Sequence, residues 1–280
     1  VERFSEARPL SIPMQYGRVE RLEELTPNMI RVTLGGDGLA SFEPTPFSDQ
    51  YINAQFVPDG APYSTPFDVD EARALPTAQR PRGRRITVRD WDPAERLLTL
   101  DFVARGAAGY AGSWAPASRG GDLLQFLGPS GSYLPDPEAD WYLLVGDETV
   151  LPAIAASLPH IPAGRPVVAV VLVEGTECEL DLNLNFEADL TTIWLHRDPE
   201  AHDHDQQLRA LEDLTFPEGR VDGFVHGEAS ETRAVRRHLL ADRHVPKEHL
   251  SASPYWRCRF TDEDWRQVKK AWVAEMEADV

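Results

Sequence analysis

The first half of the chain shows the alternation of apolar and polar residues that is typical of β-strands. Residues 14–25 and 29–34 alternate in this way and are joined by the turn signal Thr26-Pro27-Asn28. Successive side chains of a strand point to opposite faces, so each segment can bury one face. Further strands are expected at residues 51–57, 85–91, 97–104 and 123–127. Six short strands separated by turns predict a small antiparallel β-barrel.

The second half changes to apolar strands that alternate with helices. The expected strands cover residues 141–145, 167–173, 192–195 and 221–226, and the expected helices cover residues 149–158, 205–214 and 228–242. Strands without internal alternation are typical of a parallel sheet that helices cover on both faces. The turn-rich segment Leu134-Pro135-Asp136-Pro137 separates the two halves. We therefore predict a barrel domain over residues 1–136 and an α/β domain over residues 137–280.

The end of the chain predicts one more helix, over residues 261–277. Thr261 is placed to cap its N-terminus, with Asp264 three residues further on, as in a capping box. The helical spacing then forms an apolar stripe of Trp265, Val268, Trp272 and Met276. We interpret this segment as a helix that packs on the body of the protein.

Composition and charge narrow the class of protein. The 280 residues are 42% hydrophobic and 26% charged, as in globular proteins. The net charge of −18 disfavours nucleic acid and anionic membranes as partners. No apolar stretch approaches the roughly 20 residues that span a bilayer, and the start does not resemble a signal peptide. The two cysteines, Cys178 and Cys258, fit unpaired thiols in the cytoplasm, although a single disulfide between them stays open.

Positive charge is concentrated against this acidic background. Five arginines and no acid lie between Arg80 and Arg89. In a strand, one face would carry Arg85, Thr87 and Arg89, and the other Arg84, Ile86 and Val88. Guanidinium groups bind phosphates in a bidentate way, and a threonine hydroxyl can serve the edge of a flavin ring. An exposed strand with solvated arginines is the alternative interpretation.

A glycine-rich turn follows the next strand, which ends in Asp101-Phe102-Val103. It contains Gly106, Gly109, Gly112, Ser113 and Trp114 and leads into a short helical stretch. We expect Ser113 to be the N-cap of that stretch. Free backbone N–H groups and the positive end of a helix dipole make such a turn a natural seat for a diphosphate.

Three further groups lie late in the chain. Two strand-to-helix junctions carry Asp147, Glu148 and Thr149, and Glu228 with Arg233, at the sheet edge where α/β folds bind ligands. Asp147 and Glu148 could instead cap a helix. The arginines at 233–237 could bind a 2′-phosphate, or they could simply form the solvated face of a helix. The third group, which could cover a flavin and reach substrate, is Tyr255, Trp256 and Arg257. The histidines show no metal-ligand spacing.

Taken together, these motifs resemble the siderophore-interacting proteins, a family of flavin-dependent ferric-siderophore reductases. The resemblance covers nearly the whole chain. It includes the arginine strand, Asp49-Gln50, Ser113-Trp114-Ala115, Gly128-Pro129, Gly146-Asp147-Glu148-Thr149, Gly227-Glu228-Ala229-Ser230 and Tyr255-Trp256-Arg257.

The resemblance implies a ferredoxin-reductase-like fold, with an FAD-binding barrel and an NAD(P)H-reductase-like α/β domain. It implies non-covalent FAD, with electrons from NAD(P)H or ferredoxin, that reduces Fe(III) in a siderophore. Arg84 would bind the FAD phosphates, Thr87 the flavin edge, and Gly109 with residues 112–114 the diphosphate. Residues 147–149 would lie near the flavin and the nicotinamide path.

Three positions depart from the family pattern. Ile86 replaces an aromatic residue that stacks on the flavin, while Asn53 and Ser130 replace residues that are often basic. Arg257 remains as a positive charge near the substrate, which favours a chelate less anionic than a tris-catecholate. Two other functions stay open: a flavin reductase of the same plan with a different electron acceptor, and a siderophore-binding protein without enzymatic activity.

Overall fold

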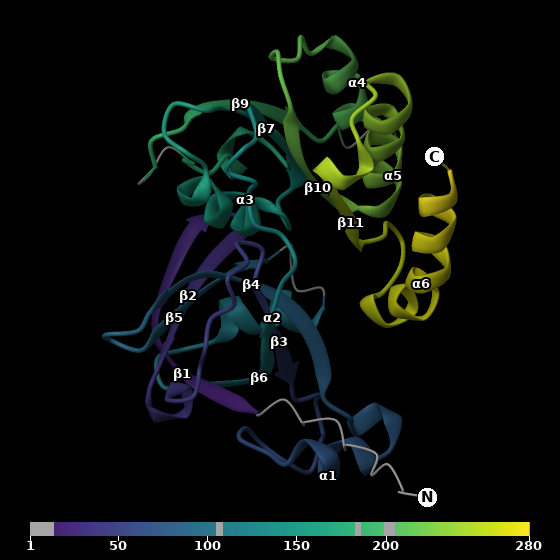
Figure 1. The fold of residues 1–280 in the computed structure, drawn as a ribbon. Helices are drawn as coiled ribbons and strands as arrows, with labels where there is room; N and C mark the ends of the chain where they lie inside the picture. The colour runs from purple at the N-terminus through teal and green to yellow at the C-terminus, as the bar shows by residue number, and fades with distance from the viewer. Residues whose placement is uncertain (1–13, 105–108, 183–185, 199–204, 280) are drawn as a thin grey trace, which may run out of the picture.

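In the computed structural model, two packed parts make up the molecule (Figure 1), and the structure describes residues 14–104, 109–182, 186–198 and 205–279. The first part is a closed barrel with strand order β1-β2-β5-β4-β3-β6 and antiparallel pairing throughout. Its strands are β1 (Gln15–Thr26), β2 (Met29–Gly35), β3 (Tyr51–Phe56), β4 (Arg82–Asp92), β5 (Leu97–Val103) and β6 (Leu123–Ser130). The six-stranded antiparallel barrel is therefore confirmed.

The barrel closes because its inward positions are apolar. Ile86 and Val88 of β4 are buried in the same core as Leu98 and Leu100 of β5, and the outward positions between them are more exposed. The helix α1 (Val69–Ala74) lies in the long connection before β4. The helix α2 (Tyr110–Ala117) follows β5 and packs on the barrel through Ala115 and Trp114.

The second part is a five-stranded sheet with the order β11-β10-β7-β8-β9, and every pairing in it is parallel. Its strands are β7 (Trp141–Asp147), β8 (Pro166–Val173), β9 (Asp189–His196), β10 (Val221–Glu228) and β11 (Leu250–Trp256). The helices α3 (Leu151–Ser157), α4 (Gln206–Asp213) and α5 (Ala229–Arg237) connect them. The predicted parallel α/β part is confirmed, but the strand β11 was not expected.

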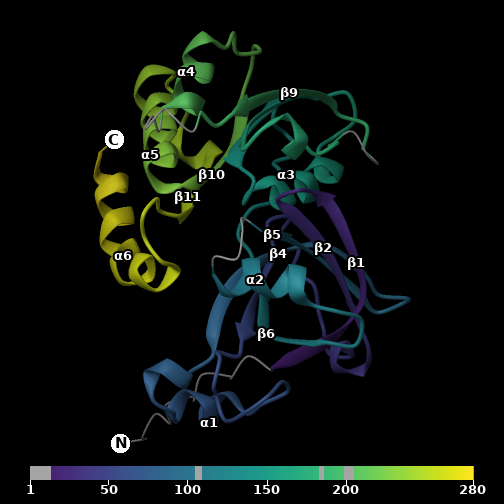
Figure 2. The same ribbon diagram turned by 180° about the vertical axis from the view of Figure 1, so that it is seen from behind.

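The terminal helix α6 (Asp262–Ala278) lies along the outer side of α5 (Figures 1 and 2). Thr261 caps it by accepting a hydrogen bond from the Asp264 backbone, as the capping box predicts. Trp265, Trp272 and Met276 are buried against Ala229. The prediction that Val268 belongs to this buried stripe is wrong: Val268 is 38% exposed, because the buried face is centred on the two tryptophans.

Buried polar contacts join the two parts. The Tyr133 hydroxyl donates to Asp222 at 3.0 Å, and the hydroxyls of Ser48 and Ser157 are hydrogen-bonded at 2.8 Å. Met29 of β2 lies in the same hydrophobic cluster as the α/β residues Tyr142 and Leu144. The barrel and the sheet therefore share a packed junction, to which β4 presents its central residues.

Two smaller observations complete the fold. Cys178 and Cys258 are both free thiols, so the disulfide left open by the sequence does not form. Among the helices that the structure describes, none combines the length and the apolar character needed to cross a bilayer.

Candidate functional site

Two arginines of β4 converge on the first residue of α2. The guanidinium carbon of Arg84 lies 5.4 Å from the centroid of the Tyr110 ring, and that of Arg82 lies 6.0 Å from it. Gly109 precedes Tyr110 with a φ of 81°, and no side chain in the described part of the chain caps the helix. A Cβ placed on Gly109 would meet nothing within 4 Å. The result is a helix N-terminus without a side-chain cap among the described residues and with two adjacent cations, the kind of donor set that a diphosphate needs.

Ser113 is not the N-cap of α2, contrary to expectation. Its hydroxyl lies inside the helix and donates to the carbonyl of Gly109 at 2.8 Å and to that of Tyr110 at 3.3 Å. The helix begins earlier because Gly109 adopts a left-handed conformation that starts the first turn there. Gly112 is buried within the helix, and Gly106 lies outside the described residues.

A cavity of about 410 Å³ opens beside this helix N-terminus. Trp114 forms an aromatic wall and packs against Phe56 at a centroid distance of 5.9 Å and against Phe102 at 5.6 Å. The lining includes Phe56, Thr65, Tyr110, Ser113, Trp114 and Leu124. The aromatic cavity and the adjacent cations offer the apolar and the phosphate-binding surfaces that a flavin dinucleotide needs, so the residues present are consistent with FAD.

The opposite face of β4 looks toward the domain junction. Thr87 pairs with Tyr51 across β3 and β4, and the Arg85 guanidinium lies 5.1 Å from the Tyr51 ring. Tyr255 of β11 approaches the same place, where burial, followed by the charges of Asp49 and Asp147, raises its pKa. Residues from both parts of the molecule therefore meet around Thr87.

The remaining candidates in the barrel have mainly structural surroundings. Ile86, Val88 and Phe102 are buried in the barrel core. Asp101 accepts two hydrogen bonds from Arg31, at 2.7 and 2.8 Å. Arg89 lies beside this pair, and its burial lowers its pKa while the Asp101 charge acts in the opposite direction. Val103 packs at the edge of the α/β core.

Asp147 joins three elements at the carboxyl edge of the sheet. Its carboxylate accepts hydrogen bonds from the Thr149 backbone at 2.8 Å, from the Glu228 backbone at 3.1 Å and from the Trp256 indole at 2.7 Å. Its exposed fraction is 1%. Asp147 does not cap a helix, because α3 begins only at Leu151 with Val150 as its N-cap.

The acids next to Asp147 are also buried. Glu148 accepts a hydrogen bond from Arg197 at 3.1 Å. Glu228 caps α5 by accepting from the backbone N–H groups of Ser230 and Glu231, and it also accepts from the Cys258 backbone at 3.0 Å. Arg197 lies within 4 Å of both Asp147 and Glu148 and supplies positive charge to this acidic edge.

Glu231 makes this edge sensitive to pH. Its burial, together with the nearby carboxylates of Asp147, Glu228 and Asp205, raises its pKa from 4.5 to about 8, and Arg197 opposes the shift. Because this pKa is higher in the folded than in the unfolded state, the contribution of Glu231 to the free energy of unfolding is fully present below about pH 4.5. That contribution is lost as the pH rises toward about 8.

Glu231→Gln is therefore expected to raise the free energy of unfolding by about 2 kcal/mol near pH 7, since it removes the cost of a buried ionisable group. Thermal unfolding of both proteins across the pH range measures this difference, which should vanish near pH 4.5. A difference that does not change with pH would contradict the assignment.

Arg233 and its neighbours hold α6. Arg233 forms a bidentate pair with Asp279, with one contact of 2.7 Å, and lies 5.5 Å from the Trp272 ring. Arg236 donates to the Met276 carbonyl at 2.9 Å. The sequence left two roles open for this arginine cluster, binding a 2′-phosphate or solvating a helix. The structure favours neither for these two side chains, because both contact α6.

The end of β11 carries the last candidates. The Trp256 indole donates to Asp147, and the Arg257 guanidinium lies 4.7 Å from the Phe260 ring. Within the described residues, no three His, Cys, Asp or Glu side chains are grouped to hold a metal ion.

Three residues of α6 reach this region although the sequence did not suggest it. Arg84 contacts Asp262 at 3.0 Å and Glu263 at 2.8 Å. Burial, and then the charge of Arg85, lower the pKa of Lys269 to about 8. The sequence predicts the start of α6 at these acidic residues, but it does not indicate that they contact Arg84.

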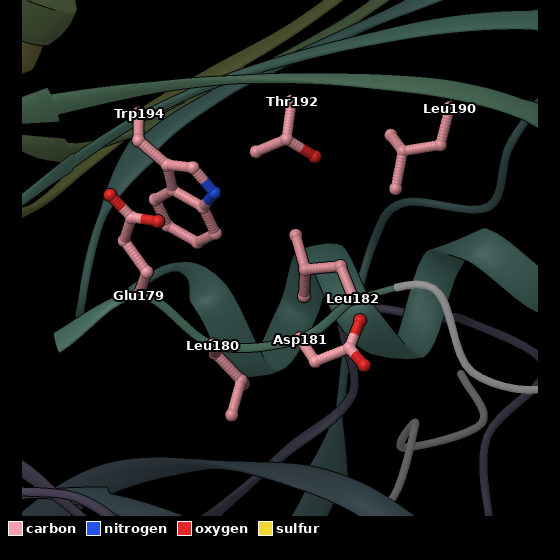
Figure 3. A pocket seen from close by; sticks show the side chains of 7 residues that line it. All are labelled: Glu179, Leu180, Asp181, Leu182, Leu190, Thr192 and Trp194. Atoms are coloured by element: carbon pink, nitrogen blue, oxygen red, sulfur yellow. The ribbon is translucent and has the colours of Figure 1, made fainter. Parts of the chain in front are cut away.

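A second cavity, of about 440 Å³, lies between β9 and the segment that follows β8 (Figure 3). Trp194 and Thr192 project into it from β9, and Leu182 and Glu179 face them from the segment. None of the predicted site residues lines it, so we place the candidate site at β4, α2 and the domain junction.

Comparison with known proteins assigns both parts of the chain to one family. Residues 18–133 match the siderophore-interacting FAD-binding domain, and residues 139–259 match the siderophore-interacting protein family. An uncharacterised protein of Mycobacterium tuberculosis is 36% identical over 95% of this chain and 98% of its own length. The ferric vibriobactin reductase of Vibrio cholerae is 28% identical over 89% of this chain and 91% of its own length.

A solved structure is similar in fold as well. The siderophore-interacting protein of Aeromonas hydrophila superposes with a TM-score of 0.77 at 26% identity, covering 93% of this chain and 98% of that one. The barrel, the parallel sheet and the FAD-binding domain define an FAD-dependent oxidoreductase of ferredoxin-reductase-like fold. Within that class, the chain belongs to the siderophore-interacting protein family.

Proposed function

We propose that this protein is a ferric-siderophore reductase that uses FAD to reduce Fe(III) in a siderophore taken into the cytoplasm. The observation that carries the proposal is the convergence of Arg82 and Arg84 on the N-terminus of α2, which no side chain of the described residues caps, beside an aromatic cavity. Family membership supports it, because a relative of similar length is named a ferric vibriobactin reductase.

The residues divide the binding of FAD between them. Arg84, with Arg82 and the backbone of residues 109–113, would hold the diphosphate by charge-assisted hydrogen bonds. The cavity lined by Trp114 and Phe56 is suited to the adenine end of the cofactor. Thr87 would donate to the edge of the flavin ring at the domain junction. When bound, FAD supplies the transfer of single electrons, while the protein supplies position and field.

The substrate would meet the junction between β3, β4 and β11. Arg85 pairs across the strands with Asn53, so it provides a positive charge on the face where Asn53 replaces a residue that is often basic. Arg257 provides another at the end of β11. Because Fe(II) binds hard oxygen ligands more weakly than Fe(III), reduction would release the iron. Two charges favour a hydroxamate or mixed chelate over a more anionic tris-catecholate.

The electron donor would be NAD(P)H or ferredoxin. A nicotinamide dinucleotide would approach the carboxyl edge of the sheet, where ligands of open α/β sheets bind. In this chain that edge carries Asp147 and Glu148 with Arg197 as their partner. Glu228 and Trp256 donate to Asp147 at the same edge and would shape the approach of the donor.

Anaerobic turnover tests the proposal. Protein reconstituted with FAD is mixed with NADH, NADPH or reduced ferredoxin and with ferric hydroxamate, mixed or tris-catecholate chelates, and Fe(II) is trapped by a ferrous-specific dye. We expect Fe(II) release with at least one donor, and faster release from the less anionic chelates. A protein that binds the chelates but takes up no flavin would instead be a siderophore-binding protein. Reduction of other acceptors alone would indicate a different flavin reductase.

A further inference from the structure

The first turn of α6 holds the same guanidinium that FAD would need. Nη1 of Arg84 lies 3.0 Å from Oδ2 of Asp262, and Nη2 lies 2.8 Å from Oε1 of Glu263. The Arg84 side chain is only 13% exposed. Both arms of the guanidinium are therefore directed at carboxylates in this structure, and not at solvent.

Arg266 adds a second connection between α6 and β4. It donates to the carbonyl of Gly83 at 2.6 Å and contacts Asp262 at 2.6 Å. Asp262, Glu263 and Arg266 thus form one contact surface against residues 83 and 84, which we call the α6 latch. The facing charges are Arg82 and Arg84 from β4, with Arg85 and Lys269 nearby.

Two carboxylates and a diphosphate compete for the same place. Each is an anion that accepts from the planar fork of an arginine, and like charges brought together at one guanidinium repel each other. The Arg84 guanidinium also lies over Tyr110, at the N-terminus of α2 where the diphosphate would bind. An incoming diphosphate therefore meets the carboxylates of the latch directly.

The rest of α6 is anchored independently of the latch. Trp272 and Met276 are buried, and Arg233 pairs with Asp279 near the end of the helix. Trp265 is buried in the same cluster, so only the residues before it need to move away from β4 while the rest of α6 stays docked. Trp265 links the first turn of α6 to the substrate side, because its indole donates to the carbonyl of Tyr255 at 3.2 Å.

We propose that the α6 latch is an autoinhibitory contact that competes with the FAD diphosphate for Arg84. This inference rests on the proposed function, since it assumes that FAD binds at Arg84. FAD loading opens the first turn of α6, and closing the latch favours loss of the cofactor. The first turn is linked to Tyr255 through Trp265, so the state of the latch is transmitted to the domain junction.

Flavin affinity of a neutralised latch tests the proposal. The double variant Asp262→Asn with Glu263→Gln keeps the shape of both side chains and leaves Thr261 as the cap. We expect it to bind FAD about tenfold more tightly than the unchanged protein in a fluorescence titration, because the closed state no longer lowers the apparent affinity. The matched control Glu275→Gln with Glu277→Gln changes the net charge equally on exposed positions and should leave the affinity unchanged.

Hydrogen exchange provides the second readout. On addition of FAD to the unchanged protein, the amides of residues 265–267 should exchange faster, while those of residues 272–276 keep their protection. Equal or weaker FAD binding by the neutralised variant, or exchange at 265–267 that does not change, overturns the latch. If no version of the protein binds FAD, the proposed function itself fails, which is a different result from FAD binding that is indifferent to the latch.

Discussion

Arg84→Ala is expected to lower the affinity of the protein for FAD by at least about 100-fold. The guanidinium lies at the N-terminus of α2, where it can form two charge-assisted hydrogen bonds with the diphosphate. Hydrogen bonds of this kind contribute about 1.5–3 kcal/mol each, so losing two accounts for a change of this size. Opening the α6 latch in the same variant returns only part of the loss. Flavin fluorescence titration measures the effect.

Arg73→Ala is the matched control for this variant. Arg73 is an exposed arginine of α1, so its removal changes the net charge equally and leaves β4 intact. The circular dichroism of both variants should match that of the unchanged protein, because Arg84 lies at the edge of the barrel core. Undiminished FAD affinity in Arg84→Ala would show that the diphosphate binds elsewhere and would remove the basis for the site.

The fold could be predicted where the pattern of apolar and polar residues within a segment indicates its secondary structure. The alternation of β1 and β2 and the apolar runs of β7 and β8 report local geometry, so the barrel and the parallel sheet follow from them. The strand β11 has no such signal. Its segment Ser251-Ala252-Ser253-Pro254 contains small and polar residues, and it forms a strand because β10 offers it a parallel partner at the edge of the sheet.

In the candidate site, too, local motifs could be recognised from the sequence, whereas long-range contacts could not. Arg84 and the glycine-rich turn belong to short motifs, and their chemistry can be recognised from the residue types and their spacing alone. The pairing of Arg84 with Glu263 spans 179 residues and depends on how α6 packs, which no local pattern contains. The engagement of Arg233 by Asp279 is similar. A basic cluster in the sequence shows where charge is, and the fold decides which charges it meets.

The start of α2 shows that the N-cap preference of a single residue can predict the wrong helix boundary. Ser113 is a favourable N-cap residue, and this preference predicts a helix that begins after it. The helix instead begins after Gly109, whose φ of 81° is open to glycine and places the first turn four residues earlier. The preference of one side chain was outweighed by the backbone freedom of another.

Asp147→Ala is expected to destabilise the protein by about 3–5 kcal/mol, because it removes the acceptor that three elements share. The backbone N–H groups of Thr149 and Glu228 and the indole N–H of Trp256 all donate to this carboxylate. Removing a buried acceptor leaves its donors desolvated without partners, which costs about 1–3 kcal/mol for each group. In a chain of this size, the midpoint of thermal unfolding should fall by about 10 °C.

The control for Asp147→Ala is Asp189→Ala, which removes an exposed carboxylate at the start of β9 in the same sheet. Its midpoint should stay within about 2 °C of the unchanged protein, since exposed charges contribute little to stability. Asp147→Asn keeps one acceptor oxygen but turns an amide N–H₂ toward other donors, so its midpoint should fall between the two. A fall in Asp147→Ala no larger than in the control would show that β7, β10 and β11 are held together without this carboxylate. The role of Asp147 would then have to be sought in its charge, which acts on Arg197 at 3.9 Å, and in the proposed nicotinamide path.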